Sequence, residues 1–430
     1  MPWVLAGENG WNAKRTVPSP CGAIATSCSS LPRSALAAAG LIAALALVAG
    51  WNAYKYPSGA GYDVRQHREY ADLLIHHGEI PGPESRSEYY TPPVFYALAG
   101  AATVVGEHVH AGDPHKLGQV LNWLVLLATA CVLWLLAREL FPRRPWLQLS
   151  ALAFFCFLPV VLRVGAMFHP EPLSMLLCAV ALLLAARMLG RHQYGWQFAV
   201  ATGVALGLAQ LVRAFSLWTF AAVVLGFAAA RAWKPLLVIV VATVVVTAPW
   251  YVRQAIEYGN PVFDRPTQQK AIWDRRPARF YVGLGLPDVV TDPIRPHFRN
   301  EAIPTTYSEV WGDYFGVWRG SRERQSILGL LPTLLALLGW AVLLARSRRV
   351  PARLPAALLP GLGILGYLYF TVSYPTPDGD VLKASYMLTT APAWALAFGY
   401  AVDRLPGRTR VVVASILAAS ALASLPFLLY

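Results

Sequence analysis

A carboxylate, a guanidinium and an imidazole lie close together in the stretch Gly61–His67, which reads GYDVRQH and follows a long apolar run. A carboxylate such as Asp63 can accept a proton from an attacking hydroxyl group, as a general base does. His67, one helical turn later, could shape that site. The alternative is structural, because Asp63 could instead cap a short surface helix or begin a solvated loop.

A second acidic group stands at the start of a later apolar run. The turn 163–171 contains His169 and Glu171, separated by Pro170. Proline favours the first position of a helix, and a carboxylate in the first turn is favoured by the helix dipole. Glu171 is therefore either a helix-start residue or a second acidic group that faces Asp63.

Several cations also lie at the ends of apolar runs, where a charge near lipid costs about 3 kcal/mol. Each could extend to the membrane interface. As a cluster they could instead bind an anionic headgroup, and phosphate suits them because arginine and lysine give it charge-assisted hydrogen bonds. These residues are Arg163, Arg213, Arg253 and Lys383.

The elements that position these groups are membrane helices. Of the 430 residues, 56% are hydrophobic and 14% are charged, whereas soluble domains carry roughly 25% charged residues. The apolar runs are long enough to cross a hydrocarbon core of about 30 Å. We expect an all-α polytopic membrane protein with eleven spans: 34–51, 117–137, 146–162, 172–189, 196–212, 214–230, 235–251, 327–345, 354–373, 384–401 and 411–430.

Lysine and arginine are concentrated in every second connection between these spans, which is the positive-inside pattern. They therefore predict a cytoplasmic N-terminus, and the net charge of +13 indicates anionic lipid rather than nucleic acid as a partner. The five cysteines show no metal-ligand spacing and predict no disulfide framework. Residues 1–33 are expected to form a disordered cytoplasmic tail before an uncleaved signal anchor.

Two apolar stretches do not have the length of a single span. The run 92–106 is too short to span and is predicted to be a re-entrant or interfacial helix. The polar break 213–216 divides 196–230 into two short spans. A single membrane domain, 34–430, then carries a first outer loop, 52–116, and a large outer loop, 252–326. With the turns at 163–171, 213 and 374–383, these loops share the extracytoplasmic side.

Four stretches together resemble the C-type glycosyltransferase superfamily, which includes protein O-mannosyltransferases and lipid A aminoarabinose transferases. The first is an Asp-x-x-x-His-x-x-Tyr run from Asp63, followed by Tyr-x-Pro-Pro from Tyr90. The second is FHPEPLSMLLCAVALLLAAR. The third is GVALGLAQLVR followed by APWYVRQAIEYGNPVF, and the fourth is PDGDVLKASYMLTTAPAWAL. The resemblance covers roughly residues 34–400.

The resemblance implies a function and roles for single residues. Asp63 matches the acidic residue proposed as catalytic base, and Glu171 resembles the second acidic position. Lys383 and Arg213 occupy regions that hold the lipid phosphate in family members. The further substrate-binding candidates are His67, Tyr90, His169 and Arg253. Thr91-Pro92-Pro93 replaces the Lys-Pro-Pro pattern of the aminoarabinose transferases, which argues against that substrate.

The expected activity is inverting transfer of a hexose or pentose from a polyprenyl-phosphate donor to a hydroxyl of an envelope glycan, lipid or protein, at a bacterial plasma membrane. No cofactor is required by the pattern, and a divalent metal at Glu171 and His169 stays open. The competing classes are a transporter or flippase of lipid-linked sugars and a noncatalytic scaffold. Neither an internal repeat nor helices broken near the midplane, which are common in transporters, is evident in the sequence.

Overall fold

The structure is a computed structural model that describes residues 33–82, 88–191, 195–261, 277–285, 291–292, 301–318, 323–373 and 382–430. Every regular element in these ranges is a helix, which confirms the predicted all-α class. The predicted tail, apart from Arg33, and much of the loop 252–326 lie outside the described residues.

Seven helical segments of the described chain are long and apolar enough to cross a membrane. They are α1 (Arg33–Lys55), α4 (Lys116–Leu140), α7 (Glu171–Arg191), α10 (Trp233–Tyr258), α14 with α15 (Glu323–Leu328 and Leu330–Ser347), η4 with α16 (Pro351–Arg353 and Leu354–Ser373) and α18 (Gly407–Leu428). The chain is therefore a multi-pass membrane protein, as predicted.

The remaining predicted spans coincide with shorter or bent elements. The stretch 146–162 forms α5 (Pro145–Phe157) and α6 (Pro159–Gly165), which meet at 54° and would make an eighth span. The other three are α8 (Trp196–Gln210), α9 (Leu217–Ala229) and α17 (Ala391–Arg404). These have 15, 13 and 14 residues, fewer than the roughly 20 that a straight span needs. The count of eleven therefore stays a prediction.

Local sequence explains where these helices break. Leu158 is extended because it precedes Pro159, which disfavours helical backbone at the residue before it. The predicted break near 213–216 is present, because α8 ends at Gln210 and the short helix η2 (Ala214–Ser216) leads into α9. The predicted start of the span 384–401 is a 3₁₀ helix, η5 (Ala384–Thr390), which precedes α17.

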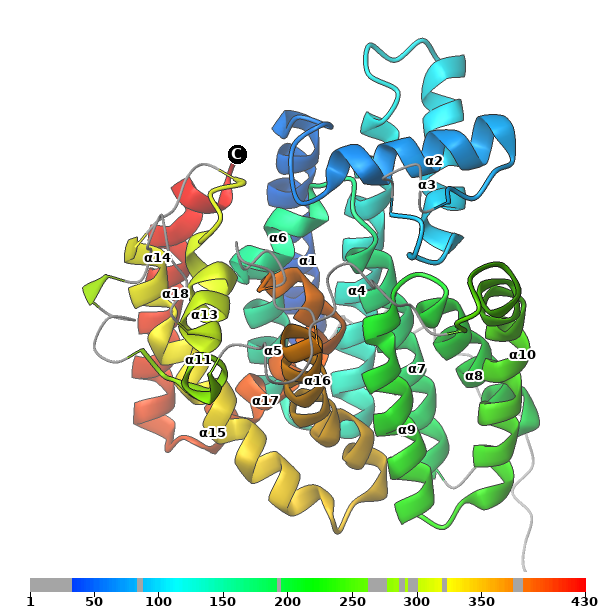
Figure 1. The fold of residues 1–430 in the computed structure, drawn as a ribbon. Helices are drawn as coiled ribbons and strands as arrows, with labels where there is room; N and C mark the ends of the chain where they lie inside the picture. Colours follow the sequence, from blue (N-terminus) through cyan, green and yellow to red (C-terminus); the bar gives the residue numbers. More distant parts are fainter. Residues whose placement is uncertain are drawn as a thin grey trace, which may run out of the picture.

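The bundle has two chemically different ends. We call the end where α1 stops and α7 starts the site end. There α2 (Val64–His77) crosses the bundle beside α3 (Val94–His108), the helix predicted as re-entrant or interfacial, and α3 also packs against α4 (Figure 1). Two further short helices of this region are α11 (Ala278–Val282) and α13 (Ala302–Gly312). Lys116 joins the ends of α1 and α4 by donating to the carbonyl oxygens of Ala53 and Tyr54 at 3.1 and 3.0 Å.

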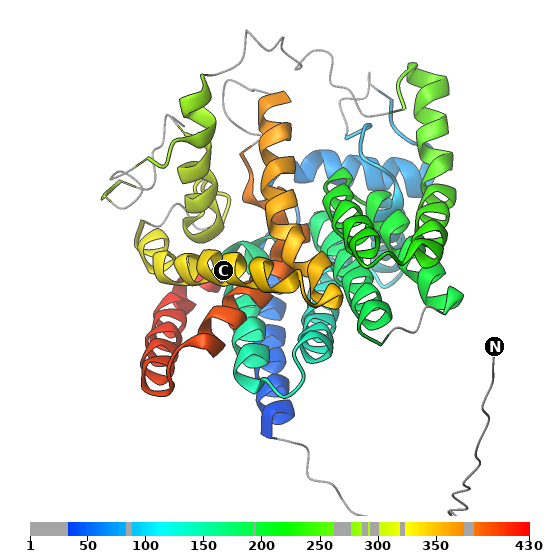
Figure 2. The same cartoon turned by 90° about the horizontal axis from the view of Figure 1, so that it is seen from below.

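We call the opposite end, where α4 stops and α5 starts, the basic end. Arg144 pairs there with Asp403 at 2.7 Å, and Arg191 pairs with Glu139 at 2.7 Å. Figure 2 shows α17 and α18 beside α5 at one side of the bundle, while α8 and α10 lie at the other side. The helices thus hold the predicted polar loops and the predicted basic connections apart.

Candidate active site

Asp63 occupies the N-cap position of α2 but makes no side-chain cap hydrogen bond. Its backbone is left-handed, with φ 51° and ψ 18°, a conformation that aspartate tolerates better than most residues. Its carboxylate instead accepts a hydrogen bond from Lys383 Nζ at 2.6 Å. The structural alternative, a helix cap, is therefore not what this geometry shows. Non-glycine residues in this conformation are concentrated at functional sites.

The charges around Asp63 keep it ionised. Burial alone would raise the pKa of this carboxyl, but the ammonium group of Lys383, through its charge and its hydrogen bond, lowers the pKa to about 2. The lysine comes from the segment just before η5, 320 positions along the chain. The pairing of Asp63 with Lys383 therefore depends on the packing of distant helices.

Glu171 forms the second charged group with Arg213. Arg213 Nε donates to a Glu171 oxygen at 2.7 Å, and both side chains are nearly fully buried. The ring of His169 lies against the other oxygen of the same carboxylate. Arg213 also donates to the Thr91 hydroxyl at 3.1 Å and lies 3.6 Å from Glu88. One guanidinium thus bridges two carboxylates, and its pKa is raised by them although burial opposes this.

Two histidines connect the two charged groups. The rings of His67 and His169 meet edge to face with centroids 5.0 Å apart. His67 Nδ1 lies 2.8 Å from the Tyr96 hydroxyl, whereas its Nε2 is buried without a hydrogen-bond partner among the described residues. Burial, His169 and Arg213 all lower the pKa of His67, which favours a neutral ring.

Tyr62 fills the space between these groups. Its ring centroid lies 5.7 Å from Lys383 Nζ and 6.1 Å from the ring of His169. The Tyr62 hydroxyl is buried and, within the described ranges, has no hydrogen-bond partner. Buried polar atoms are nearly always paired in folded proteins. The unpaired atoms of Tyr62 and His67 therefore mark a place where a polar ligand would gain hydrogen bonds.

The structure brings most of the predicted site residues together. Asp63, His67, His169, Glu171, Arg213 and Lys383 form one connected cluster. Tyr90 joins its edge, because its hydroxyl donates to Glu88 at 2.6 Å. Arg253 lies apart and pairs with Glu257 at 2.6 Å on its own helix.

The fourth cation of the sequence analysis, Arg163, belongs to a different cluster. Its Nη2 lies 2.7 Å from a Glu309 oxygen, and its Nε lies 3.7 Å from Asp313. None of these three side chains is more than 2% exposed. Burial and Asp313 raise the pKa of Glu309 well above its usual range. Arg163 thus makes internal contacts that attach α13 to α6.

Sequence reasoning missed three residues of the cluster: Glu88, Thr91 and Tyr386. Glu88 and Thr91 lie within two positions of Tyr90, a predicted substrate-binding residue, and this proximity in sequence could have indicated them. Tyr386 follows Lys383 by three positions, and its ring centroid lies 5.6 Å from the Arg213 guanidinium. No sequence pattern indicated that this ring would meet Arg213.

The two predicted metal ligands do not fit a metal site. One oxygen of Glu171 is bound by Arg213, so a cation there would compete with a buried guanidinium. In the part of the chain that the structure describes, no group of three or more histidine, cysteine, aspartate or glutamate side chains is arranged to hold a metal ion.

The helix bundle is similar in fold to two solved proteins, ArnT and an archaeal oligosaccharyltransferase. ArnT from Cupriavidus metallidurans bound to undecaprenyl phosphate matches with a TM-score of 0.51 and 19% identity, over 90% of this chain and 64% of that one. The same protein in its apo state matches with a TM-score of 0.54 and 18% identity, over 91% of this chain and 65% of that one.

The Archaeoglobus fulgidus oligosaccharyltransferase in its apo form gives a TM-score of 0.56 and 14% identity, over 91% of this chain and 55% of that one. The same enzyme was also solved with zinc and sulfate, at a TM-score of 0.52. This chain thus spans less than two thirds of the length of these proteins. None of the family models and none of the curated proteins compared matches it. At these identities the likeness is one of fold.

Proposed function

We propose that this protein transfers a sugar from a polyprenyl-phosphate-linked donor to an acceptor hydroxyl, with inversion at the anomeric carbon. The observation that carries the proposal is the ion pair between the buried Lys383 and the partly exposed Asp63, at the site end of a bundle with this fold. A solved ArnT with this fold is bound to undecaprenyl phosphate, which supports a donor of that class. The acceptor is a glycan, lipid or protein of a bacterial envelope, reached from the extracytoplasmic side.

In this proposal the donor phosphate binds at Lys383 and Arg213. Lysine and arginine give phosphate charge-assisted hydrogen bonds, and they stabilise the negative charge that grows on it as it leaves. Lys383 has an acidic partner already, Asp63, at 2.6 Å. An incoming phosphate would compete with that carboxylate for the ammonium group.

This competition would prepare Asp63 for catalysis. While Lys383 is bound to it, the carboxylate is a weak base because its pKa is held at about 2. If the ammonium turns to the phosphate, burial still disfavours the charged carboxylate, so its pKa rises and it becomes a stronger base. Binding of the donor would thus activate the residue that accepts the acceptor's proton.

The transfer itself is one displacement. The acceptor oxygen attacks the anomeric carbon as its proton passes to an Asp63 oxygen. The bond from that carbon to the phosphate oxygen breaks, and the electron pair leaves with the polyprenyl phosphate. His67 Nε2 and the Tyr62 hydroxyl, which have no hydrogen-bond partner among the described residues, would form hydrogen bonds with hydroxyls of the sugar.

Glu171 was predicted as a second catalytic acid residue, and its contacts support a positioning role. It holds Arg213 through one oxygen and faces His169 with the other. We therefore assign Glu171 the task of orienting the cation that binds phosphate. Glu88 and Thr91 would support Arg213 from the opposite side.

The proposal is tested with the full chain reconstituted in lipid and supplied with labelled polyprenyl-phosphate sugars and extracted envelope. Appearance of the label in an envelope acceptor supports a transferase. Movement of the intact labelled lipid across the bilayer, without transfer, would identify a flippase instead. The stereochemistry of the product tests inversion, because retention would require a covalent or double-displacement route.

The substitution Asp63→Asn tests the general base. Turnover should fall by about 10²–10⁴-fold, the usual contribution of such a group, while the protein still inserts and remains monodisperse. Glu69→Gln is the matched control, since Glu69 lies on the same helix and its only described ion pair is with the exposed Arg65. Near-normal turnover of Asp63→Asn would remove Asp63 from the chemistry.

A further inference from the structure

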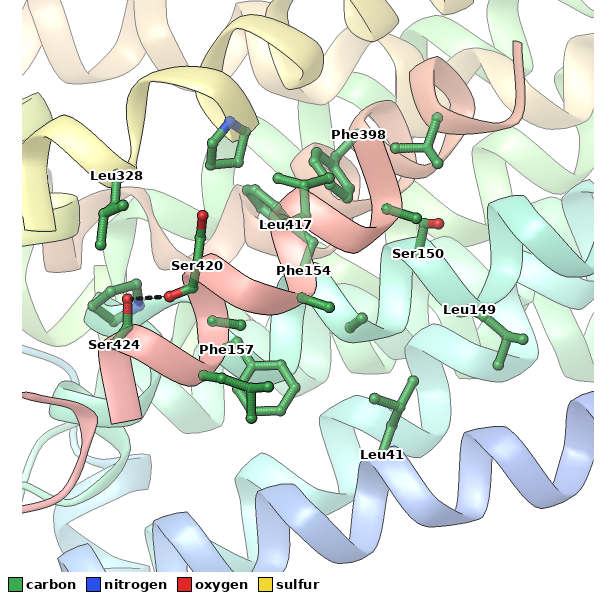
Figure 3. A pocket seen from close by; sticks show the side chains of 18 of the residues that line it. Leu41, Leu149, Ser150, Phe154, Phe157, Leu328, Phe398, Leu417, Ser420 and Ser424 are labelled. Atoms are coloured by element: carbon green, nitrogen blue, oxygen red, sulfur yellow. Dashed lines mark hydrogen bonds between the residues drawn. The ribbon is translucent and has the colours of Figure 1, made fainter. Parts of the chain in front are cut away.

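A cavity of about 710 Å³ lies between α1, α5, α17, α18 and the segment α14–α15, away from the residues of the proposed reaction (Figure 3). Its walls are almost entirely hydrocarbon, from residues such as Leu41, Phe154, Phe157 and Leu417. Its few polar side chains offer little to a polar ligand, because the Ser424 hydroxyl already donates to the Ser420 carbonyl at 2.8 Å. Such a space suits an apolar chain.

We infer that the cavity faces the membrane interior. Its walls belong largely to segments that are long enough to span, and α18 contributes a wall although only 17% of its most apolar window is buried in the protein. Apolar ligands bind in pockets of about 300–1,000 Å³. An empty apolar cavity is destabilising because its walls lose packing contacts. In a bilayer the available filling material is a lipid chain.

The cavity extends to the basic end, and we take this part as its mouth. Pro145, Trp146 and Val402 line it there, and they adjoin Arg144 and Asp403 in the chain. Arg410 lies over the Trp146 ring, 5.7 Å from its centroid. Within 141–146 and 402–410 the sequence has five arginines and a single acidic residue. This excess of positive charge suits an anionic headgroup.

We propose that this cavity binds an anionic phospholipid of the bilayer leaflet at the basic end. An acyl chain would lie in the cavity, between α18 and the α1–α5 pair. The phosphate would lie at Arg144 and Arg410. Arg144 is about half exposed, so it can reach a headgroup while it holds Asp403.

The polyprenyl tail of the sugar donor is the competing occupant. Its phosphate belongs, in the proposed function, at Lys383 and Arg213 at the site end, where α1 ends and α7 begins. The basic cluster lies at the opposite ends of these helices. A tail whose phosphate lies at the site end would leave this excess of positive charge without an anionic headgroup, which favours the phospholipid.

The test measures lipid retention by native mass spectrometry of the full chain in mild detergent. Phosphatidylglycerol and phosphatidylcholine with identical acyl chains are compared. We expect at least tenfold stronger retention of phosphatidylglycerol. The double substitution Arg144→Gln and Arg410→Gln should abolish that preference, while Arg348→Gln with Arg349→Gln, in another connection of the basic end, should leave it unchanged.

A second variant keeps the charges and fills the cavity. Ala153→Trp should remove retention of both lipids, because the indole would occupy the space of the acyl chain. Equal retention of both lipids by the unaltered protein would overturn the proposal. So would displacement of the phospholipid by polyprenyl phosphate, which would assign the cavity to the donor tail. Sugar transfer is assayed separately, so a failure of either proposal leaves the other testable.

Discussion

Lys383 is the residue whose removal should affect both donor binding and proton transfer. Its ammonium group lies within hydrogen-bond distance of the Asp63 carboxylate. Burial raises the pKa of that carboxyl, and the charge of Lys383 lowers it. A carboxylate acts as a base only above its pKa, so activity is lost as the pH falls through that value. The acid limb of the pH dependence of kcat/KM should therefore report the pKa of Asp63 in its pair with Lys383.

Lys383→Met should move this acid limb to higher pH. With the cation gone, burial remains and the pKa of Asp63 rises above its present value of about 2. The donor concentration for half-maximal rate should also rise by about 10- to 100-fold, the equivalent of one charged hydrogen bond. The measurement is the pH dependence of kcat/KM at varied donor concentration.

Lys55→Met is the control for this experiment, because Lys55 is an exposed lysine at the same end of the bundle. It should leave both the pH profile and the donor dependence unchanged. A change confined to the acceptor dependence of Lys383→Met would contradict the assignment of Lys383 to the phosphate.

At the residue scale, types and spacing predicted which groups could do chemistry but not how they pair. Asp63, His67 and Glu171 were visible because charged residues stand out next to apolar runs. Arg213 was also visible, yet its contact with Thr91 joins residues 122 positions apart. Such a contact depends on the packing of several helices, and a single sequence carries no signal for it.

Among the elements, α13 is attached to the bundle by a buried ion cluster. Arg163 on α6 contacts both a side-chain oxygen and the main-chain carbonyl of Glu309, at 2.7 and 2.5 Å. The Asp313 carboxylate accepts hydrogen bonds from the backbone N–H groups of Val317 and Trp318. Trp318 in turn donates to the carbonyl of Phe427 at 3.0 Å, which links this loop to the end of α18.

Arg163→Met should destabilise the protein by about 3–5 kcal/mol, because it leaves the buried Asp313 without its cation and Glu309 without its hydrogen-bond donor. The measurement is thermal or denaturant unfolding in a fixed detergent. Arg191→Gln is the control, since Arg191 pairs with Glu139 while 56% of its side chain is exposed, and such a loss costs about 1 kcal/mol or less. Equal stability of the two variants would show that the buried cluster stabilises the protein no more than the exposed Arg191–Glu139 pair does.

The elements themselves were largely predictable, because apolar runs long enough to cross a bilayer leave few alternatives to a helix. The bend within 146–162 was missed although Pro159 was in view. A proline in a membrane helix can be accommodated or can break it, and the outcome depends on what the second segment packs against. Here α6 packs against α13 and carries Arg163 into the buried cluster.

At the scale of the whole molecule, the polar cluster and the arginine-rich connections occupy opposite ends of the helices. The cluster of Asp63 and Lys383 follows α1, whereas Arg144 and Arg410 lie where α5 and α18 begin. The positive-inside rule then predicts that the basic end faces the cytoplasm and the site end faces outward. The proposed reaction and the proposed lipid site would accordingly belong to opposite leaflets.

This orientation can be measured by cysteine labelling in intact cells. The background is a variant in which all five native cysteines are replaced by alanine or serine. Glu69→Cys, on α2 at the site end, should react with a membrane-impermeant maleimide added outside. Arg408→Cys, at the basic end, should react only after the cells are opened. Both positions are exposed or partly exposed in the protein, so burial does not explain a difference. Labelling of Arg408→Cys alone in intact cells would reverse the orientation and place Asp63 in the cytoplasm, where an extracytoplasmic acceptor could not reach it.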